Sequence, residues 1–254
     1  MRQWFDAHGW AEASPDLFGF GEPIVSIMQH HFDEVMAGRY NTGMPPTGAS
    51  NFGGQLVKVT NGWLANDVIR RAVMDAGIAK LAADMLGVGE LYLWADSLYW
   101  KAPNAGGEQS QIGWHQDKQY WRSSSTDKMI TACTALYQAG PRTGGMRFAD
   151  GSHQWGLVGG SDALSSHENR GAHGIPPLPP GRSWVEVCPE LVPGSVTFHH
   201  CLTFHSSGPN LSDRPRRSIT IHMVAGEGVA VDGNIDAIAK GFPFRGPLHP
   251  RLYP

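Results

Sequence analysis

Residues 111–121 place a histidine and an aspartate two positions apart in an aromatic, strand-like segment, QIGWHQDKQYW. On a strand, side chains at positions i and i+2 point to the same face. His115 and Asp117 would then project side by side, an imidazole and a carboxylate within reach of one cation. Trp114 and Gln116 would point to the opposite face. This spacing predicts half of a metal site.

A second His-x-Asp pair, His31 and Asp33, occurs in QHHFDEV. This segment has the apolar spacing of a helix, and helix positions two apart do not face each other. The two side chains cannot converge on one ion without distorting the helix. We therefore expect His31 and Asp33 to lie outside any metal site.

A third ligand is expected farther along the chain. Two imidazoles and one carboxylate on one face of an octahedron leave three open positions, which is the ligand set of non-haem Fe(II) oxygenases. The histidines that could complete it are His199, His200, His205 and His222. His199 and His200 are neighbours in a strand-like run, where one would face inward and the other outward. Both remain alternatives to His205.

The residues after His205 are informative about its role. Ser207, Asn210 and Arg216 follow in order, and a new strand is expected to begin near Arg216. An Fe(II) oxygenase of this kind usually needs an oxidisable dicarboxylate, 2-oxoglutarate, whose far carboxylate requires a fixed cation. Arginine suits this task because its planar guanidinium binds a carboxylate through two hydrogen bonds.

Three arginines compete for that role, and strand alternation distinguishes them. Arg216 shares a face with the polar Ser218 and Thr220, whereas Arg217 shares a face with two isoleucines. Arg214 precedes a proline, which favours a turn. The alternation therefore predicts Arg216 on the polar face of the strand.

These segments resemble the phytanoyl-CoA dioxygenase (PhyH)-like family of Fe(II)/2-oxoglutarate oxygenases. WHQD, GGMRFADGSHQWG and HSSGPNLSDRPRR look like its three landmark segments in the right order, and the resemblance covers roughly residues 90–225. It implies that His115, Asp117 and His205 bind Fe(II). It also implies that Arg216 binds 2-oxoglutarate with help from the hydroxyl of Ser207.

The same resemblance implies that Gln116 and Cys133 line the co-substrate pocket. The family often has an aromatic residue near Cys133, and a proline where Asp150 stands here. Relatives that halogenate lack the carboxylate, so Asp117 disfavours halogenation. The implied reaction consumes O₂ and 2-oxoglutarate and oxidises an unactivated C–H bond, by hydroxylation or by radical cyclisation, epimerisation or desaturation.

The elements that must position these residues change along the chain. Residues 22–38 and 66–87 have helical spacing, with Asn66 or Asp67 as N-cap and Gly87 after the last turn. Residues 40–54 read as a loop. From residue 91, short segments rich in β-branched and aromatic residues alternate with turns. They are residues 91–101, 129–137, 195–200 and 217–225, and 141–153 reads as a turn, a strand and another turn.

This order predicts a mainly β fold with flanking helices, a double-stranded β-helix (jelly roll, cupin-like) core backed by N-terminal helices. We expect one PhyH-like oxygenase domain over residues 1–254. Residues 1–90 would be mainly helical, 91–225 would form the jelly roll, and 226–254 would be a Gly/Pro-rich tail.

Composition bounds the function classes. The 254 residues include 41% hydrophobic residues, 32 Gly and 18 Pro, which favours a turn-rich β protein with a sizeable core. A net charge of −3 provides no basic field for nucleic acid. Three cysteines without C-x-x-C spacing argue against a disulfide framework and a zinc ribbon. Without a signal-like or membrane-spanning run, we expect a cytoplasmic protein with no membrane partner; the oligomeric state is not indicated.

Residues close to the landmark segments are candidates for a substrate site. They are Tyr99, Trp100, Tyr120, Trp121, Met146, Arg147 and Trp155. They favour an apolar or aromatic small molecule, such as a polyketide-like natural product modified during antibiotic biosynthesis. The alternatives are a fatty acyl-CoA hydroxylase, a cupin-like metal enzyme that does not use 2-oxoglutarate, and a non-catalytic jelly-roll binding module. No G-x-S-x-G motif supports a serine hydrolase.

Overall fold

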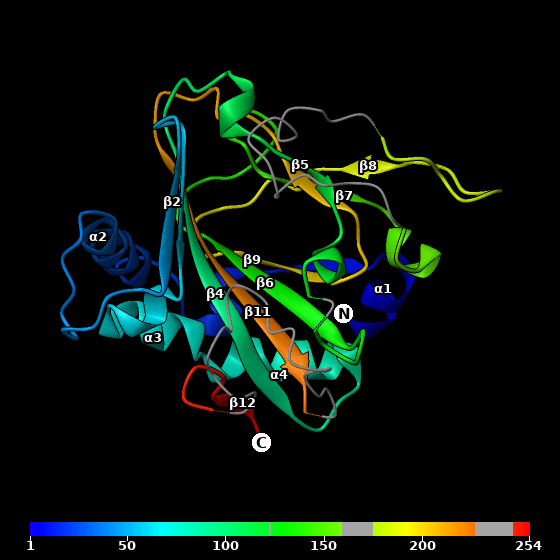
Figure 1. The fold of residues 1–254 in the computed structure, drawn as a ribbon, viewed down its shortest axis with the longest axis horizontal. Coiled ribbons are helices and arrows are strands. Elements are labelled where there is room, and N and C mark those ends of the chain that lie inside the picture. The colour runs from blue at the N-terminus through cyan, green and yellow to red at the C-terminus, as the bar shows by residue number, and fades with distance from the viewer. Residues whose placement is uncertain (122, 159–174, 227–245) are drawn as a thin grey trace.

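Two antiparallel sheets form the core of the computed structural model, which describes residues 1–121, 123–158, 175–226 and 246–254 (Figure 1). The large sheet has the order β1-β9-β6-β11-β4-β3-β2, with β12 paired to β4, and the small sheet has the order β5-β10-β7-β8. The strands are β1 Trp10–Ala13, β2 Gly48–Phe52, β3 Leu56–Thr60, β4 Leu91–Lys101, β5 Ile112–His115, β6 Met129–Ala135, β7 Met146–Ala149, β8 Glu186–Val187, β9 Val196–His200, β10 His205–Ser207, β11 Arg216–Ala225 and β12 Arg251–Tyr253. The predicted fold class is confirmed.

The helices pack against one face of the large sheet, as Figure 1 shows for α2, α3 and α4. The α-helices are α1 Arg2–His8, α2 Ile24–Met36, α3 Asp67–Val73 and α4 Ala76–Leu86; the 3₁₀ helices are η1 Pro15–Phe18, η2 Gly62–Leu64, η3 Glu108–Ser110, η4 Asp117–Gln119 and η5 Ser152–Trp155. Phe32, Ile78 and Ile221 share the buried core between these helices and the sheet. No helix in the described ranges is long and apolar enough to cross a membrane.

The segment predicted as one helix over residues 66–87 is two helices. Asn66 caps α3 by accepting hydrogen bonds from two backbone N–H groups of its first turn, as expected. Asp75 then caps α4 by accepting a hydrogen bond from the backbone N–H of Ile78, and this second cap breaks the helix that the apolar spacing suggested. Gly87 ends α4 with φ 66°, in the left-handed region that favours glycine.

The first ninety residues are less helical than expected, because β1, β2 and β3 join the large sheet. The predicted loop over residues 40–54 contains β2, so this expectation was wrong in its second half. Strand β2 is largely exposed at the sheet edge, so it lacks the alternation of apolar and polar residues that marks a half-buried strand. Residues 227–245 of the predicted tail lie outside the described ranges, and β12 near its end pairs with β4.

The middle strands of the large sheet align residues from distant parts of the chain. His222 on β11 pairs with Thr131 on β6, and Thr131 pairs with His199 on β9. Paired residues of neighbouring antiparallel strands project to the same side. This register therefore places three polar side chains in one row, on the face opposite the helices.

Candidate metal centre

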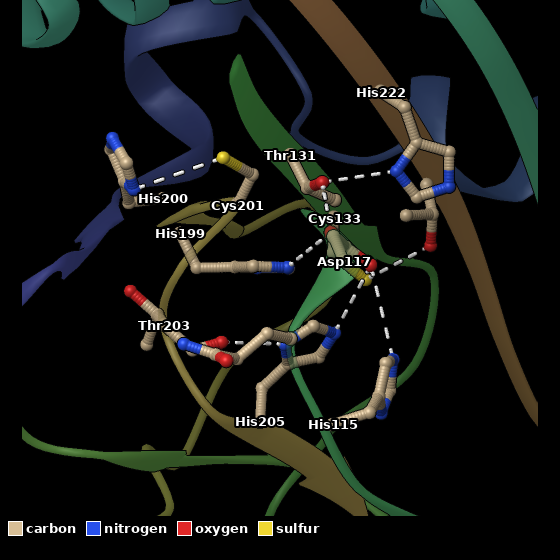
Figure 2. Close-up of polar contacts among 12 residues, drawn as sticks. His115, Asp117, Thr131, Cys133, His199, His200, Cys201, Thr203, His205 and His222 are labelled. Atoms are coloured by element: carbon tan, nitrogen blue, oxygen red, sulfur yellow. Dashed lines mark hydrogen bonds and ion pairs between the residues drawn. The ribbon is translucent and has the colours of Figure 1, made fainter. Parts of the chain in front are cut away.

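Three side chains from neighbouring elements meet at one point. His115 ends β5, Asp117 begins η4, and His205 begins β10, where it pairs with His115. The Nε2 atoms of His115 and His205 lie 3.8 Å and 3.6 Å from Asp117 Oδ1. The candidate ligand atoms all lie within 4.8 Å of one another, and all three residues are buried (Figure 2).

His115 and Asp117 converge, but not because both lie on one strand, as the sequence predicted. Strand β5 ends at His115, so Asp117 does not continue the strand but starts η4. Gln116 between them keeps extended backbone angles, with φ −110° and ψ 130°. The two side chains therefore still fall on the same side, although only one of them belongs to a strand.

Hydrogen bonds leave the metal-facing nitrogen of each histidine unprotonated. His115 Nδ1 lies 2.8 Å from the carbonyl oxygen of Gly113, and His205 Nδ1 lies 3.0 Å from that of Thr203. A carbonyl only accepts, so each Nδ1 carries the proton and each Nε2 keeps a free lone pair. Burial lowers the pKa of His115 to about 3 and that of His205 to about 4. Both imidazoles are thus neutral at pH 7 and suited to binding a metal ion.

The second oxygen of Asp117 has its own partners. Thr131 Oγ1 lies 2.7 Å and His199 Nε2 lies 3.1 Å from Asp117 Oδ2. Burial alone would raise the pKa of Asp117, but the neighbouring His205 and His199 hold it well below its usual value, so the carboxylate is ionised. His199, an alternative ligand in the sequence, thus contacts the outer oxygen of Asp117. His200 instead accepts a hydrogen bond from the backbone of Leu202.

The second His-x-Asp pair lies elsewhere, on α2. His31 contacts Asn66 at 3.1 Å, and Asp33 forms a two-point ion pair with Arg217 at 2.6 Å and 2.8 Å. The two side chains of this pair therefore serve contacts between α2 and two different elements. His31 and Asp33 are thus directed at different partners, as expected for helix positions two apart.

A cavity of about 320 Å³ adjoins the three candidate ligands and is walled by both sheets. Alternate residues of β11 line it, in the order Arg216, Ser218, Thr220 and His222. Arg217 points to the opposite face, where it meets Asp33. The alternation predicted for this strand is therefore what the structure has: of Arg216 and Arg217, Arg216 lines the cavity.

Arg216 is buried, and no counter-ion for it lies among the residues that the structure describes. Its residue is 5% exposed, and within the described part of the chain no side chain or carbonyl forms a hydrogen bond or ion pair with it. A buried guanidinium without a partner is costly, because its desolvation is not offset by an opposite charge. The wall around Arg216 thus favours an anionic ligand.

A buried lysine, Lys101, is the strand partner of Arg216. Lys101 is fully buried, and its Nζ donates hydrogen bonds to Ser207 Oγ at 2.6 Å and to the carbonyls of Ser207 and Gly208 at 3.2 Å and 2.6 Å. Burial, with the charges of Arg216 and Arg147, lowers the pKa of Lys101 well below its usual value. Ser207 is thereby held beside Arg216, where both line the cavity.

Two residues expected in the co-substrate pocket lie outside the cavity wall. The side-chain amide of Gln116 donates to the carbonyls of Gly156 and Leu202 and accepts from the backbone of Val158. Through these three contacts, the side-chain amide of Gln116 links its own segment to the backbone at Gly156, Val158 and Leu202. Cys133 is buried behind the wall, where the hydroxyl of Thr220 contacts its sulfur at 3.6 Å.

Of the residues predicted to contact the substrate, some line the cavity and others pack outside it. Those that line the cavity are Tyr99, Tyr120, Trp121 and Met146. Trp100 packs on the helix side, because it alternates with Tyr99 along β4. The guanidinium of Arg147 lies over the ring of Trp114 and pairs with Glu186, and Trp155 packs against Trp184 and Phe204. Trp100, Arg147 and Trp155 therefore do not reach the cavity.

Several wall residues were not found from the sequence. They include Lys58, Thr131 and Ser218, together with Lys101 behind the wall, where it holds Ser207; His222 is expected from the sequence only as a possible ligand. The alternation of β11 that selected Arg216 also selects Ser218 and His222, so that signal was available. Lys58 and Lys101 carried no such signal, because a lysine on a strand is more often exposed.

Comparisons with known proteins agree with this arrangement. A profile of the phytanoyl-CoA dioxygenase (PhyH) family matches residues 31–218. A probable phytanoyl-CoA dioxygenase of Caenorhabditis elegans is 27% identical over 156 residues, which cover 58% of this chain and 47% of that protein. A probable alpha-ketoglutarate-dependent hypophosphite dioxygenase of Stutzerimonas stutzeri is 28% identical over 180 residues, 68% of this chain and 58% of that protein. The chain thus spans about half the length of these curated relatives.

Solved structures share the fold at low sequence identity. The alpha-ketoglutarate-dependent epimerase SnoN from nogalamycin biosynthesis matches with a TM-score of 0.76 at 20% identity, covering 100% of this chain and 97% of that one. The carbocyclase SnoK from the same biosynthesis matches with a TM-score of 0.71 at 20% identity, covering 98% and 94%. Because the profile spans most of the chain and includes the His115, Asp117 and His205 segments, this protein belongs to the phytanoyl-CoA dioxygenase (PhyH) family.

Proposed function

We propose that this protein is a non-haem Fe(II)/2-oxoglutarate-dependent oxygenase that oxidises an unactivated C–H bond of an apolar small molecule. The observation that carries the proposal is the pairing of two features in one cavity. One wall holds two neutral imidazoles and an ionised carboxylate, and another holds the buried guanidinium of Arg216, which has no partner in the described part of the chain. This pairing suits a metal ion that is chelated by a dicarboxylate.

The residues fit iron through their donor set. Both Nε2 atoms and Asp117 Oδ1 face one point, and each imidazole is oriented by a backbone carbonyl behind it. Such support fixes the tautomer and the ring orientation of a metal-binding histidine. His115, Asp117 and His205 would hold the ion and leave the other positions open.

The residues fit 2-oxoglutarate through charge and unused hydroxyls. Arg216 would bind the far carboxylate in a two-point contact, and Ser207 lies beside it. The buried hydroxyls of Ser206 and Ser218, both in the cavity wall, have no hydrogen-bond partner in the described ranges of the chain. A carboxylate placed against Arg216 would satisfy polar groups that are costly when left unpaired.

When bound, iron and 2-oxoglutarate supply the oxidising power that cleaves a C–H bond with O₂. The protein chain positions the substrate and excludes water. The aromatic side chains of Tyr99, Tyr120 and Trp121 give the remaining wall its apolar character. They would hold the substrate close to the metal and keep bulk water away from it.

For the substrate we favour an aromatic, polyketide-like natural product over a fatty acyl-CoA. The rings that line the cavity suit a flat apolar molecule, and the similar structures SnoN and SnoK belong to nogalamycin biosynthesis. Because two curated relatives are named as phytanoyl-CoA dioxygenases, a fatty acyl-CoA should be assayed as the alternative substrate. Conversion of a fatty acyl-CoA, with no turnover of aromatic polyketides, would contradict this choice.

The function is tested by anaerobic titration of the protein with Fe(II) and 2-oxoglutarate. We expect the visible charge-transfer band of the chelate, followed by succinate release when O₂ is admitted. Asp117→Ala should lose the band through loss of iron, because one of three protein ligands is removed. Iron binding without the band and without succinate would favour a metal enzyme that does not use 2-oxoglutarate. Absence of iron binding would favour a non-catalytic binding module.

A further inference from the structure

The outer oxygen of Asp117 is surrounded by side chains of the large sheet, whereas the candidate metal ligands belong to β5, η4 and β10. Thr131 on β6 and His199 on β9 contact Asp117 Oδ2, and His222 on β11 contacts Thr131 at 3.0 Å (Figure 2). These three residues are the row of paired positions across β11, β6 and β9. The sheet register therefore brings them under one carboxylate.

The direction of each hydrogen bond in this row follows from the carboxylate. An ionised carboxylate only accepts, so Thr131 donates its single hydroxyl proton to Asp117 Oδ2. The oxygen of Thr131 must then accept from His222 Nδ1, which carries the proton of that ring. His199 donates its Nε2 proton to the same Oδ2. Asp117 Oδ2 thus receives two donors, and one of them is itself oriented by His222.

Packing alone does not explain a histidine at position 199, because burying this ring leaves one of its nitrogens unsatisfied within the described ranges. It is fully buried, and its Nδ1 is an acceptor without a hydrogen-bond partner among the described residues. An unsatisfied buried polar group costs about 1–3 kcal/mol, and an apolar ring of similar size would avoid that cost. Its Nε2 contact with Asp117 is the feature of His199 that an apolar ring could not supply.

From these contacts we infer that His199 and Thr131, the latter supported by His222, are positioning residues that make Asp117 a one-oxygen metal ligand. The inference rests on the proposed function. A carboxylate can bind a metal through one oxygen or both. With Oδ2 held by two donors, only Oδ1 faces the Nε2 atoms of His115 and His205. The coordination position that a second carboxylate oxygen would occupy stays open for co-substrate.

The geometry shows that His199 is placed to position Asp117 and not to bind the metal as a fourth ligand. The described group of converging ligand atoms contains His115, Asp117 and His205, and His199 is not in it. The ring of His199 lies beside that of His205, with 4.1 Å between centroids, but its Nε2 is directed at Asp117 Oδ2. His199 therefore acts on the metal through Asp117.

The test compares the metal affinity of four variants with that of the unsubstituted protein. His199→Phe keeps a ring without the donor, and Thr131→Val keeps the shape without the hydroxyl. His199→Gln and Thr131→Ser restore a donor at each position. The affinity for Fe(II) alone is measured anaerobically by competition with a chelating dye, and thermal unfolding of the metal-free variants verifies that each one folds.

We expect His199→Phe and Thr131→Val to weaken Fe(II) binding by about 10- to 100-fold, the usual effect of removing a partner behind a metal ligand. The Gln and Ser variants should recover most of that loss. Thr197→Val is the matched control, because Thr197 is also a buried threonine of the large sheet but its hydroxyl has no partner among the residues described by the structure. It should bind Fe(II) as the unsubstituted protein does.

Three results would overturn the inference. They are unchanged affinity in both His199→Phe and Thr131→Val, failure of Gln and Ser to restore it, and an equal loss in Thr197→Val, which would indicate a packing effect. Each of these leaves the proposed function intact, since the unsubstituted protein still binds iron. Failure of the unsubstituted protein to bind Fe(II) would instead remove the proposed function, and the inference with it.

Discussion

At the scale of single residues, Arg216 and Arg217 show how one position along a strand changes a side chain's task. Arg216 is buried in the cavity wall without a counter-ion among the residues that the structure describes, whereas Arg217 forms a two-point ion pair with Asp33 on α2. The alternation of β11 sends adjacent side chains to opposite faces. The two guanidinium groups therefore allow a matched pair of substitutions with different expected results.

Arg216→Ala should raise the 2-oxoglutarate concentration needed for the charge-transfer band by about 30-fold or more. Truncating one partner of a buried charge pair costs about 2–5 kcal/mol, and 1.4 kcal/mol corresponds to a factor of ten. The affinity for Fe(II) alone should not change, because Arg216 is not among the candidate ligands. Arg217→Met is the control and should leave the 2-oxoglutarate requirement as it is. Equal losses of iron binding in Arg216→Ala and Asp117→Ala would show that Arg216 has been misassigned.

At the scale of elements, the contacts between helices and the large sheet support the wall of the site. The ion pair of Arg217 with Asp33 joins β11 to α2. Because the side chain of Asp33 is 46% exposed, solvent screens this pair, and its contribution is about 1 kcal/mol or less. Arg217→Met should therefore lower the free energy of unfolding only slightly, as measured by urea denaturation. A loss above about 3 kcal/mol would show that the pair behaves as a buried one.

Strand β4 is joined to η2 by a buried carboxylate. Asp96 accepts hydrogen bonds from the backbone N–H groups of Gly62 at 3.1 Å and Trp63 at 3.2 Å. Burial nevertheless raises the pKa of Asp96 to about 7, and these two hydrogen bonds only partly oppose the shift. In the unfolded chain the pKa of this group is about 3.8. Between these values the folded protein holds a proton that the unfolded chain has released.

The stability that Asp96 contributes is therefore fully present below pH 4 and is lost as the pH rises through 7. From pH 5 to pH 8 the unsubstituted protein should lose about 3 kcal/mol relative to Asp96→Asn, since two pKa units correspond to about 2.7 kcal/mol. Urea denaturation of both proteins at the two pH values measures this difference. Parallel pH profiles for the two proteins would show that Asp96 keeps an ordinary pKa in the fold.

At the scale of the whole molecule, the site exists only where the two sheets face each other. The small sheet supplies His115 and His205, and the large sheet supplies Arg216, Thr131 and His199. A ligand that bridges these walls binds the folded chain and has no comparable site in the unfolded one. Metal and co-substrate should therefore stabilise the fold as a whole.

Co(II), an air-stable substitute for Fe(II), together with 2-oxoglutarate should raise the melting temperature by about 5–10 °C. Ligand at 100 times its Kd adds about 2.7 kcal/mol, and 1 kcal/mol shifts Tm by roughly 2–4 °C in a chain of this size. Differential scanning calorimetry measures the shift. His115→Ala should show little of it, and a full shift in that variant would mean that the ligands bind elsewhere.

Much of this protein was determined by local sequence alone. The strand period of residues 91–101 and 217–225 gave the main strands of the large sheet, and the caps at Asn66 and Gly87 set two helix ends. Alternation placed Arg216 rather than Arg217 on the cavity side. These results follow from propensity and period, which act over a few residues.

Tertiary structure alone decided which distant side chains meet. His199 and His205 were alternatives in the sequence, and only the pairing of β10 with β5 placed His205 beside His115 while β9 placed His199 behind Asp117. The burial of Lys101 and the position of Gln116 outside the cavity wall were equally invisible in the local pattern. The physical reason is that sheet register joins segments about ninety residues apart at the site and farther apart elsewhere in the large sheet, and no local period of the chain encodes that choice.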